Sequence, residues 1–524
     1  MARPRLWRWC GWLAAGAACG VLVALSVPPF GWWPLAWCGF AGIALLLPRR
    51  TLPVRVAIGF GAGLGQFVPG LWWVQEFSVW GCVALIVLGA LFFAAALALV
   101  PSRRRRGVAL GMPALLMLSA WARDRFPLHG FPLAGAALGQ AASPLAASAR
   151  FGGSLLLTGV TVLAGVALAE LVQAGRSWAV ARSPWAPGSI ARRDAHRTTV
   201  AFVAVAAVTA AIPGFAWVSP SGQGGNLRPV RVALVQGGGR RGTRAIFTDP
   251  QVVFDRHLAA SASIDSPVDL VVWPEGVLQS GVPFRGTADA SDVARLALRL
   301  GATVVVGVEQ DVGSSRYVNE VVAWSPHGRI VATYQKNHLV PFGEYVPYRS
   351  LLRHLFNLAD VPLDAIPGHQ VGYMSTPAGG LGVMISYEDF FDERARGGVR
   401  AGGQLLVVPT NTSSYRSTQV PTQEVAASRI RAWETGRWLV QVTPVGYTAV
   451  VGPEGQVDQR STLDEQTVVY ATVPRETGRT VYVDVGPVPF ALGALALAVL
   501  AWVLAWPGRR QLGGGHHDTW SAHP

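Results

Sequence analysis

The chain has 524 residues, of which 51% are hydrophobic and only 14% are charged, and its mean hydropathy is +0.34. This composition is too apolar for an ordinary soluble protein and excludes a disordered one. The formal net charge of +14 first indicates a nucleic-acid binder. The placement of the positive charges decides whether nucleic-acid binding can be kept as an interpretation. The four cysteines, Cys10, Cys19, Cys38 and Cys82, lie near the N-terminus, which excludes a zinc finger, a disulfide framework and a cysteine nucleophile after residue 82.

Apolar runs of bilayer-spanning length are the dominant signal in the sequence. They predict a polytopic α-helical membrane protein with about eight spans, near residues 10–27, 32–47, 56–74, 81–100, 107–121, 151–174, 199–218 and 486–506. The first run leads straight into further hydrophobic segments and lacks a clear cleavage site. We therefore expect a retained span there and not a signal peptide.

Arginine placement predicts the orientation of these spans. With the N-terminus in the cytoplasm, the cytoplasmic segments carry clusters such as Arg103–Arg106, whereas the opposite short loops carry only Arg123, Arg125 and Arg150. This asymmetry follows the positive-inside rule, so the long segment between the last two spans is expected outside the cytoplasm. The positive charge belongs to the cytoplasmic loops and the rest of the chain is near neutral, which excludes a nucleic-acid partner.

The external segment alternates strand-like and helix-like patterns. Short β-branched runs between helical patterns predict an α/β fold whose strands are buried on both faces. The predicted strands are Arg231–Gln236, Val268–Trp273, Thr303–Val308, Glu320–Trp324, Arg329–Tyr334, Gly382–Tyr387, Gln404–Val408 and Trp438–Val442. The predicted helices lie near residues 249–263, 290–300, 389–401 and 420–436.

These patterns predict four regions along the chain. Residues 1–227 form a membrane domain of about seven transmembrane helices, and residues 228–484 form the external domain. Residues 485–507 form a C-terminal transmembrane helix, and the Gly/His-rich residues 508–524 form a disordered cytoplasmic tail.

Polar residues collect where the predicted strands of the external domain end. Glu275 follows VDLVVWP directly, Lys336 follows RIVATYQ with Glu344 eight residues later, and Ser386 stands near the end of GVMISYE before Glu388. Because ligands bind outside the carboxyl ends of strands in an α/β sheet, we expect these side chains to meet. Each one alone fits an ordinary surface or packing residue. Together they supply a base, a cation for an oxyanion and a hydroxyl that can be acylated, the parts of acyl transfer through a covalent intermediate.

The motifs VVWPE, YQKNHLVPFGEYVP and a strand ending in SYE resemble the Glu–Lys–Cys framework of the nitrilase, or carbon–nitrogen hydrolase, superfamily. With the flanking membrane spans, the chain is similar to the apolipoprotein N-acyltransferase family. Further matches are VALVQG at Val232–Gly237, GFPLAGAALGQ at Gly130–Gln140 and the segment Arg431–Gly455. The resemblance covers roughly residues 28–484 and implies a nitrilase-like αββα sandwich for the external domain.

The resemblance also implies a function, lipoprotein maturation in the bacterial cytoplasmic membrane, and the arginine placement predicts both termini in the cytoplasm. Such enzymes move an acyl chain from a phospholipid, through an enzyme thioester, to the N-terminal amine of a diacylglyceryl-cysteine lipoprotein. By position, Glu275 would be the general base, Lys336 would stabilise the oxyanion and Glu344 would orient that lysine. Tyr387 and Glu388 would line the pocket, with no metal and no cofactor.

The family pattern has a cysteine where this chain has Ser386. A thiol ionises near pH 8.5 and can be activated by one carboxylate, whereas a serine usually needs a histidine held by a third group. The nearest histidine in the motifs is His338.

Three hypotheses follow from this substitution. The first is a working N-acyltransferase that uses Ser386 as its nucleophile. The second is a catalytically impaired relative that binds lipid or lipoprotein or assists an active paralogue. The third is an amide hydrolase or a transporter-like membrane protein. A transporter would be expected to carry paired ionisable groups inside its spans, but Glu76 and Glu170 lie at span ends.

Overall fold

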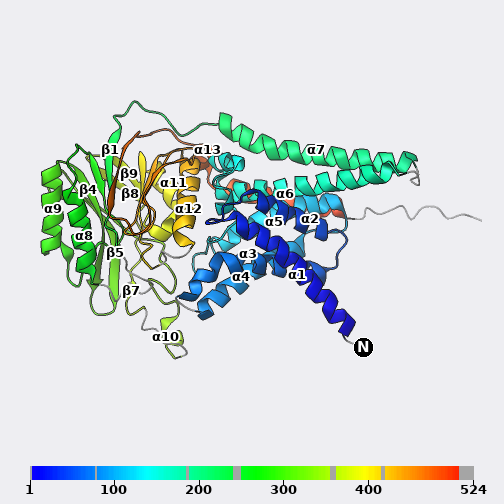
Figure 1. The fold of residues 1–524 in the computed structure, drawn as a ribbon, viewed down its shortest axis with the longest axis horizontal. Coiled ribbons are helices and arrows are strands. Elements are labelled where there is room, and N and C mark those ends of the chain that lie inside the picture. The colour runs from blue at the N-terminus through cyan, green and yellow to red at the C-terminus, as the bar shows by residue number, and fades with distance from the viewer. Residues whose placement is uncertain are drawn as a thin grey trace, which may run out of the picture.

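The computed structural model describes residues 3–76, 79–183, 188–239, 249–354, 361–414 and 419–506. The predicted tail, residues 508–524, lies outside the described residues. A bundle of long helices from both ends of the chain packs end-on against an α/β domain built from the segment between them (Figure 1).

A helix coincides with each apolar run predicted from the sequence. These helices are α1 (Arg3–Ser26), α2 (Pro34–Leu46), α3 (Leu52–Leu71), α4 (Val79–Leu99), α5 (Arg105–Arg123), α6 (Ala149–Ala181), α7 (Gly188–Val218) and α14 (Val488–Ala505). Over the described ranges, five helical segments are long and apolar enough to cross a membrane: Leu52–Glu76, Val79–Leu99, Pro144–Ala181, Ser189–Val218 and Val488–Ala505. The helices α1, α2 and α5 fall short of that measure. The structure therefore fits a membrane protein.

Small residues set the closest packing in the bundle, between α1 and α3. A Cβ added to Gly16 would clash with the carbonyl oxygen of Ile58, and one added to Gly20 would clash with that of Ala62. Because these glycines let the two backbones touch, the helices gain dispersion contacts that do not depend on exclusion of water.

Two sheets form the centre of the α/β domain. The first runs in the order β14-β1-β2-β4-β5-β6, and the second runs β13-β12-β11-β10-β9-β8. Two short strands also join the first sheet, β3 beside β4 and β7 beside β5. The strands are β1 (Val230–Gln236), β2 (Leu270–Val272), β3 (Leu278–Ser280), β4 (Thr303–Val312), β5 (Arg316–Trp324), β6 (Ile330–Gln335), β7 (Asp364–Ala365), β8 (Tyr373–Thr376), β9 (Gly379–Val383), β10 (Leu405–Pro409), β11 (Leu439–Val442), β12 (Ala449–Val451), β13 (Val457–Arg460) and β14 (Thr467–Val473).

The sheets pack face to face and helices cover both outer faces (Figure 1). Apolar residues of both sheets, such as Leu234 and Val407, share one buried core. Helices α8 (Pro250–Ala262) and α9 (Ala288–Leu300) cover the first sheet, and α11 (Asp392–Arg400) and α12 (Val420–Thr435) cover the second. This four-layer αββα sandwich is the fold that the resemblance implied.

Short helical segments complete the chain. They are η1 (Trp72–Glu76), η2 (Leu138–Gln140), η3 (Pro144–Ser148), η5 (Phe284–Gly286), α10 (Arg349–Leu352), η6 (Ser386–Phe390) and α13 (Val481–Val485).

Two boundaries predicted next to Ser386 are wrong. The strand predicted over Gly382–Tyr387 ends at Val383, and Ser386–Phe390 form the 3-10 helix η6. The reason is local. The N–H of Ile385 donates to the Glu388 carboxylate at 2.9 Å, so it is not used to pair with a neighbouring strand. The helix predicted from residue 389 therefore begins only at Asp392.

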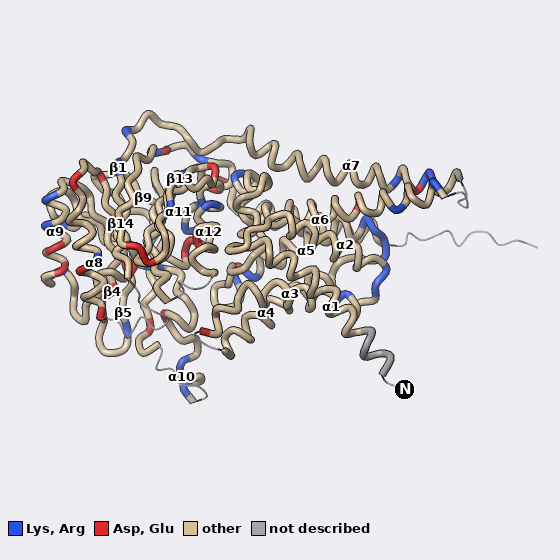
Figure 2. The backbone as a smooth tube through the Cα atoms, in the orientation of Figure 1, with Lys and Arg blue, Asp and Glu red and all other residues tan. Residues whose placement is uncertain are grey.

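The charges are distributed as the sequence predicted. Figure 2 shows Lys and Arg gathered at the end of the bundle farthest from the α/β domain. The α/β domain carries both signs across its surface (Figure 2).

Candidate active site

A buried lysine lies between two carboxylates at one edge of the first sheet. Lys336 Nζ is 2.8 Å from Glu275 Oε1 and 2.8 Å from Glu344 Oε1. The lysine is 1% exposed and Glu275 is 5% exposed. The structure thus brings together three of the residues singled out from the sequence.

The strands explain why these side chains meet. Glu275 follows β2 and Lys336 follows β6, and both strands end at the same edge of the sheet. Asn319, on the intervening strand β5, links the two acids: its Nδ2 donates to Glu275 Oε1 at 2.8 Å and to Glu344 Oε1 at 3.0 Å. Asn319 could not be predicted from the sequence, because an asparagine within a strand carries no signal before the pairing of the strands is known.

Electrostatics keep Lys336 charged in this cluster. Burial alone would lower the pKa of Lys336, but the charges of Glu275 and Glu344 and the hydrogen bonds to them raise that pKa above its ordinary value. The site therefore holds a buried, charged ammonium group in a low-dielectric position, where charges interact strongly.

The two carboxylates differ in how their oxygens are used. Glu344 is fully engaged, because its Oε1 accepts from Lys336 and Asn319 and its Oε2 accepts the N–H of Val340 at 2.7 Å. Both hydrogen bonds to Glu275 within the described ranges arrive at Oε1. Glu275 Oε2 is thus the oxygen of the pair that is left to take a proton.

Ser386 occupies a sharp turn between a strand and a helix. It follows β9, opens η6 and has φ of +52°, a left-handed backbone conformation that a non-glycine residue adopts at a cost. Its neighbours Ile385 and Tyr387 are buried, whereas Ser386 itself is only half-buried. The sharp turn therefore leaves Ser386 more exposed than the residues on either side of it.

Glu388 connects this turn to the lysine segment. Its carboxylate is fully buried and accepts the N–H of Asn337 at 2.8 Å, the N–H of His338 at 3.1 Å and the N–H of Ile385 at 2.9 Å. The hydroxyl of Tyr334 donates to the same carboxylate at 3.0 Å. Because Asn337 follows Lys336 directly, these bonds hold the Ser386 turn beside the lysine.

Tyr387 faces the helical bundle. Its hydroxyl donates to the carbonyl oxygen of Gly130, between α5 and α6, at 3.1 Å, and its ring lies edge-on to Phe391 with centroids 5.1 Å apart. The turn that carries Ser386 is therefore fastened to the membrane part of the molecule on one side and to the lysine segment on the other.

The contacts of His338 do not place it to act as a base for Ser386. Its ring stacks on Phe391 with centroids 4.1 Å apart, and its Nε2 lies 3.6 Å from Glu393 Oε1. Burial lowers the pKa of His338 to about 4. Across the described ranges, no hydrogen bond joins His338 to Ser386 and no group of three His, Cys, Asp or Glu side chains could hold a metal ion.

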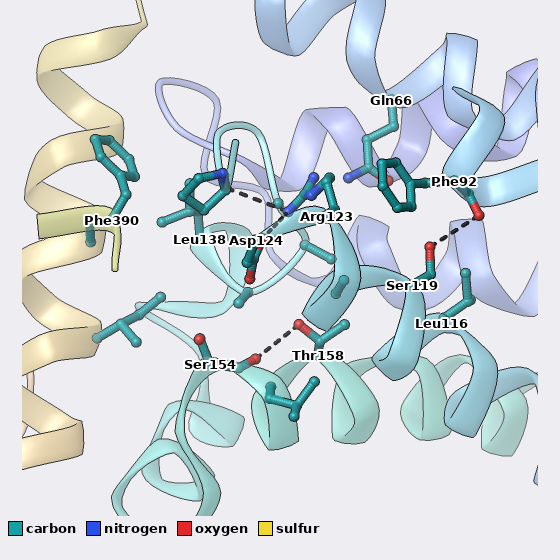
Figure 3. A pocket seen from close by; sticks show the side chains of 18 of the residues that line it. Gln66, Phe92, Leu116, Ser119, Arg123, Asp124, Leu138, Ser154, Thr158 and Phe390 are labelled. Atoms are coloured by element: carbon teal, nitrogen blue, oxygen red, sulfur yellow. Dashed lines mark hydrogen bonds and ion pairs between the residues drawn. The ribbon is translucent and has the colours of Figure 1, made fainter. Parts of the chain in front are cut away.

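A small cavity of about 60 Å³ lies between the bundle and η6 and α12. Figure 3 shows Phe390 on one side of it and Gln66, Phe92 and Arg123 on the other. Arg431 of α12 also lines it.

Two family profiles match the chain. One, described as "Apolipoprotein N-acyltransferase N-terminal domain", matches residues 19–167, and the other, "Carbon-nitrogen hydrolase", matches residues 231–482. The second match coincides with the αββα domain, which is therefore nitrilase-like.

Curated relatives align with nearly the whole chain. The apolipoprotein N-acyltransferase of Geobacter metallireducens is 31% identical over 93% of this chain and 94% of its own length. The one from Azotobacter vinelandii is 31% identical over 95% of each chain. The one from Mycolicibacterium smegmatis is 29% identical over 95% of this chain and 86% of its own length. The chain thus belongs to the apolipoprotein N-acyltransferase family.

Proposed function

We propose that this protein is an acyltransferase that moves an acyl chain from a phospholipid to the N-terminal amine of a diacylglyceryl-cysteine lipoprotein, with Ser386 as the nucleophile. Family membership supports the reaction. The observation that carries the assignment is the ammonium of Lys336, fixed between Glu275 and Glu344 beside a half-buried serine on a strained turn.

In the first half-reaction, Ser386 Oγ attacks the ester carbonyl carbon of the phospholipid and its proton passes to Glu275 Oε2. The carbonyl oxygen becomes an oxyanion, which the Lys336 ammonium stabilises. When the tetrahedral intermediate collapses, the bond to the glycerol oxygen breaks. That oxygen takes the proton back from Glu275, so a lysophospholipid leaves and the acyl group stays on Ser386.

In the second half-reaction, the lipoprotein amine attacks the acyl-serine carbonyl carbon and Glu275 accepts a proton from that amine. Lys336 again stabilises the oxyanion. The Ser386 oxygen then leaves with the proton from Glu275, which forms the amide and restores the free enzyme. An oxyester reacts more slowly with amines than a thioester does, so this half-reaction is expected to limit the rate.

Glu344, Tyr387 and Glu388 have supporting roles in this scheme. Glu344 orients Lys336, since both of its oxygens already accept hydrogen bonds. Glu388 and Tyr387 fasten the nucleophile turn to the lysine segment and to the bundle. No metal or cofactor takes part in any step.

The proposal includes the topology. The bacterial cytoplasmic membrane would be crossed about eight times, by residues 1–227 and 485–507, with both termini in the cytoplasm and residues 228–484 outside. The arginines at the far end of the bundle favour this orientation (Figure 2). The active site would then lie at the outer surface of the membrane, where phospholipid and lipoprotein substrates meet it.

An activity assay with Ser386 variants tests the proposal. The purified full-length protein is given phospholipid and a diacylglyceryl lipopeptide, and the N-acylated product is measured for wild type, Ser386→Ala and Ser386→Cys. The exposed Ser375 supplies the matched control Ser375→Ala. The proposal predicts product from wild type, none from Ser386→Ala and more from Ser386→Cys.

Two other results would overturn it. Product from Ser386→Cys but none from wild type would identify an impaired relative, which binds lipid or lipoprotein or assists an active paralogue. Equal product from wild type and Ser386→Ala would remove Ser386 from the mechanism.

A further inference from the structure

A buried aspartate lies in the 3-10 helix that follows Ser386 and has no part in the mechanism above. Asp389 is in η6, three residues after Ser386, and is 0% exposed. Its Oδ2 lies 2.8 Å from Ser428 Oγ of α12, and its Oδ1 is buried with no hydrogen-bond partner among the described residues.

The protons around Ser428 can be counted. Ser428 Oγ also lies 2.9 Å from Gln441 Oε1 of β11. The amide of Gln441 is oriented by its Nε2, which donates to the carbonyl oxygen of Tyr447 at 3.0 Å. Turning that amide round would place Gln441 Oε1 against the Tyr447 carbonyl, two acceptors facing each other.

A hydroxyl has only one proton to donate. If Ser428 donates to Gln441, the short contact between Ser428 Oγ and Asp389 Oδ2 needs a proton from Asp389. If Asp389 were ionised, one of the two contacts of Ser428 would join a pair of unprotonated acceptors. Both short contacts of Ser428 are therefore hydrogen bonds only if Asp389 carries a proton.

We propose that Asp389 is a positioning residue that works as a neutral carboxylic acid, whose proton completes the hydrogen-bond chain Asp389–Ser428–Gln441–Tyr447 and ties the nucleophile turn to α12 and β11. Its effect on rate rests on the acyltransferase function proposed above. The protonation itself is independent of turnover.

The charged groups around Asp389 agree with a neutral acid. Arg431 faces it from α12, but this guanidinium already pairs with Glu434, 3.0 Å away. Glu424 of the same helix is a second buried acid, and Glu388 of η6 takes its donors from other segments. Burial raises the pKa of Asp389 to about 7, against the attraction of Arg431 and the hydrogen bond with Ser428.

Ionisation of Asp389 would act on the reaction in two ways. It would break the chain that holds the turn, and it would place a negative charge behind the position where the oxyanion forms. The rate of acyl transfer should therefore decline on the alkaline side as Asp389 loses its proton, by roughly tenfold per pH unit at the limit.

Three substitutions separate these effects. Asp389→Asn keeps a donor to Ser428 and removes the titration, whereas Asp389→Ala removes the donor. Asp311→Asn is the matched control, since Asp311 is exposed at the end of β4. The variants are compared by infrared difference spectra near pH 6 and by pH profiles of kcat, in the wild-type and Ser386→Cys backgrounds.

The wild-type minus Asp389→Asn spectrum should contain a carboxylic-acid C=O band that the Asp311→Asn difference lacks. The alkaline decline in kcat should disappear in Asp389→Asn, while Asp389→Ala should lower kcat at every pH. Absence of the band would overturn the proposal, and so would an unchanged alkaline decline in Asp389→Asn. If neither background turns over, the proposed function fails, and the infrared band still decides the protonation of Asp389.

Discussion

Glu434, on helix α12 of the α/β domain, accepts a hydrogen bond from the backbone N–H of Ser154 at a distance of 2.7 Å. Ser154 stands where α6 resumes after a kink at Gly152 and Gly153. The first N–H groups of a helix lack partners within it, so a carboxylate of one domain caps a helix of the other. The same helix α12 carries Ser428, which contacts Asp389 of η6, and thus one element connects the membrane bundle to the turn that contains Ser386.

This cap predicts an effect of Glu434 on stability. Glu434→Ala should lower the free energy of unfolding by about 3 kcal/mol, because it leaves the Ser154 N–H unsatisfied and the buried Arg431 unpaired. Glu434→Gln retains an acceptor for Ser154 and should lose less. Thermal unfolding of the purified protein in detergent measures both. An Ala variant as stable as the Gln variant would contradict the capping role.

Removal of the buried Lys336 should destabilise the protein, because its charge balances those of Glu275 and Glu344. Lys336→Met leaves Glu275 and Glu344 buried without their cation, so it should abolish activity and destabilise the protein by about 3–5 kcal/mol. Adding Glu344→Gln removes one of the two uncompensated charges and should restore part of the stability but none of the activity. The prediction fails if the double variant unfolds at a lower temperature than Lys336→Met.

Glu388 should tolerate no isosteric replacement. In Glu388→Gln the amide NH₂ would face N–H and O–H donors that now point at a carboxylate, so at least one donor loses its acceptor. We expect stability to fall by about 1–3 kcal/mol. The value of kcat should fall by a larger factor than that by which KM changes. Glu393→Gln, at an exposed position, is the control and should behave as wild type.

The raised pKa of Asp389 predicts how the stability of the protein depends on pH. Burial raises the pKa of Asp389 to about 7, whereas an aspartate in the unfolded chain titrates near 4. The folded state thus retains a proton that the unfolded state releases, so the contribution of Asp389 to stability is complete below about pH 4 and is lost as the pH rises to about 7. The unfolding temperature of wild type should fall more steeply than that of Asp389→Asn between pH 5 and about 7. Parallel curves would contradict this prediction.

Much of the architecture could be predicted because it depends on apolar periodicity. The long apolar runs and the buried strands such as β1 and β10 are continuous hydrophobic segments, which a sequence displays directly. The short strand β13 was missed because it lies at a sheet edge with largely exposed side chains, and its residues VDQR show neither a continuous apolar run nor strict alternation.

Only the part of the site that lies directly after strands could be predicted from the sequence. Glu275 and Lys336 follow strands of one sheet, so their meeting follows from the topology. The left-handed turn at Ser386 and the proton on Asp389 depend on hydrogen bonds from segments far away in sequence, Asn337 and Ser428 among them. Such long-range bonds have no local signature.

The most direct test of the central claim is the mass of the acylated enzyme. The full-length protein is incubated with phospholipid but no lipopeptide, digested, and the peptide that contains Ser386 is examined by mass spectrometry. The account predicts that this peptide carries one acyl chain on Ser386, which disappears when the lipopeptide is added and N-acylated product forms. Product formation with Ser386 unmodified at every stage, or an acyl chain on another residue, would contradict it.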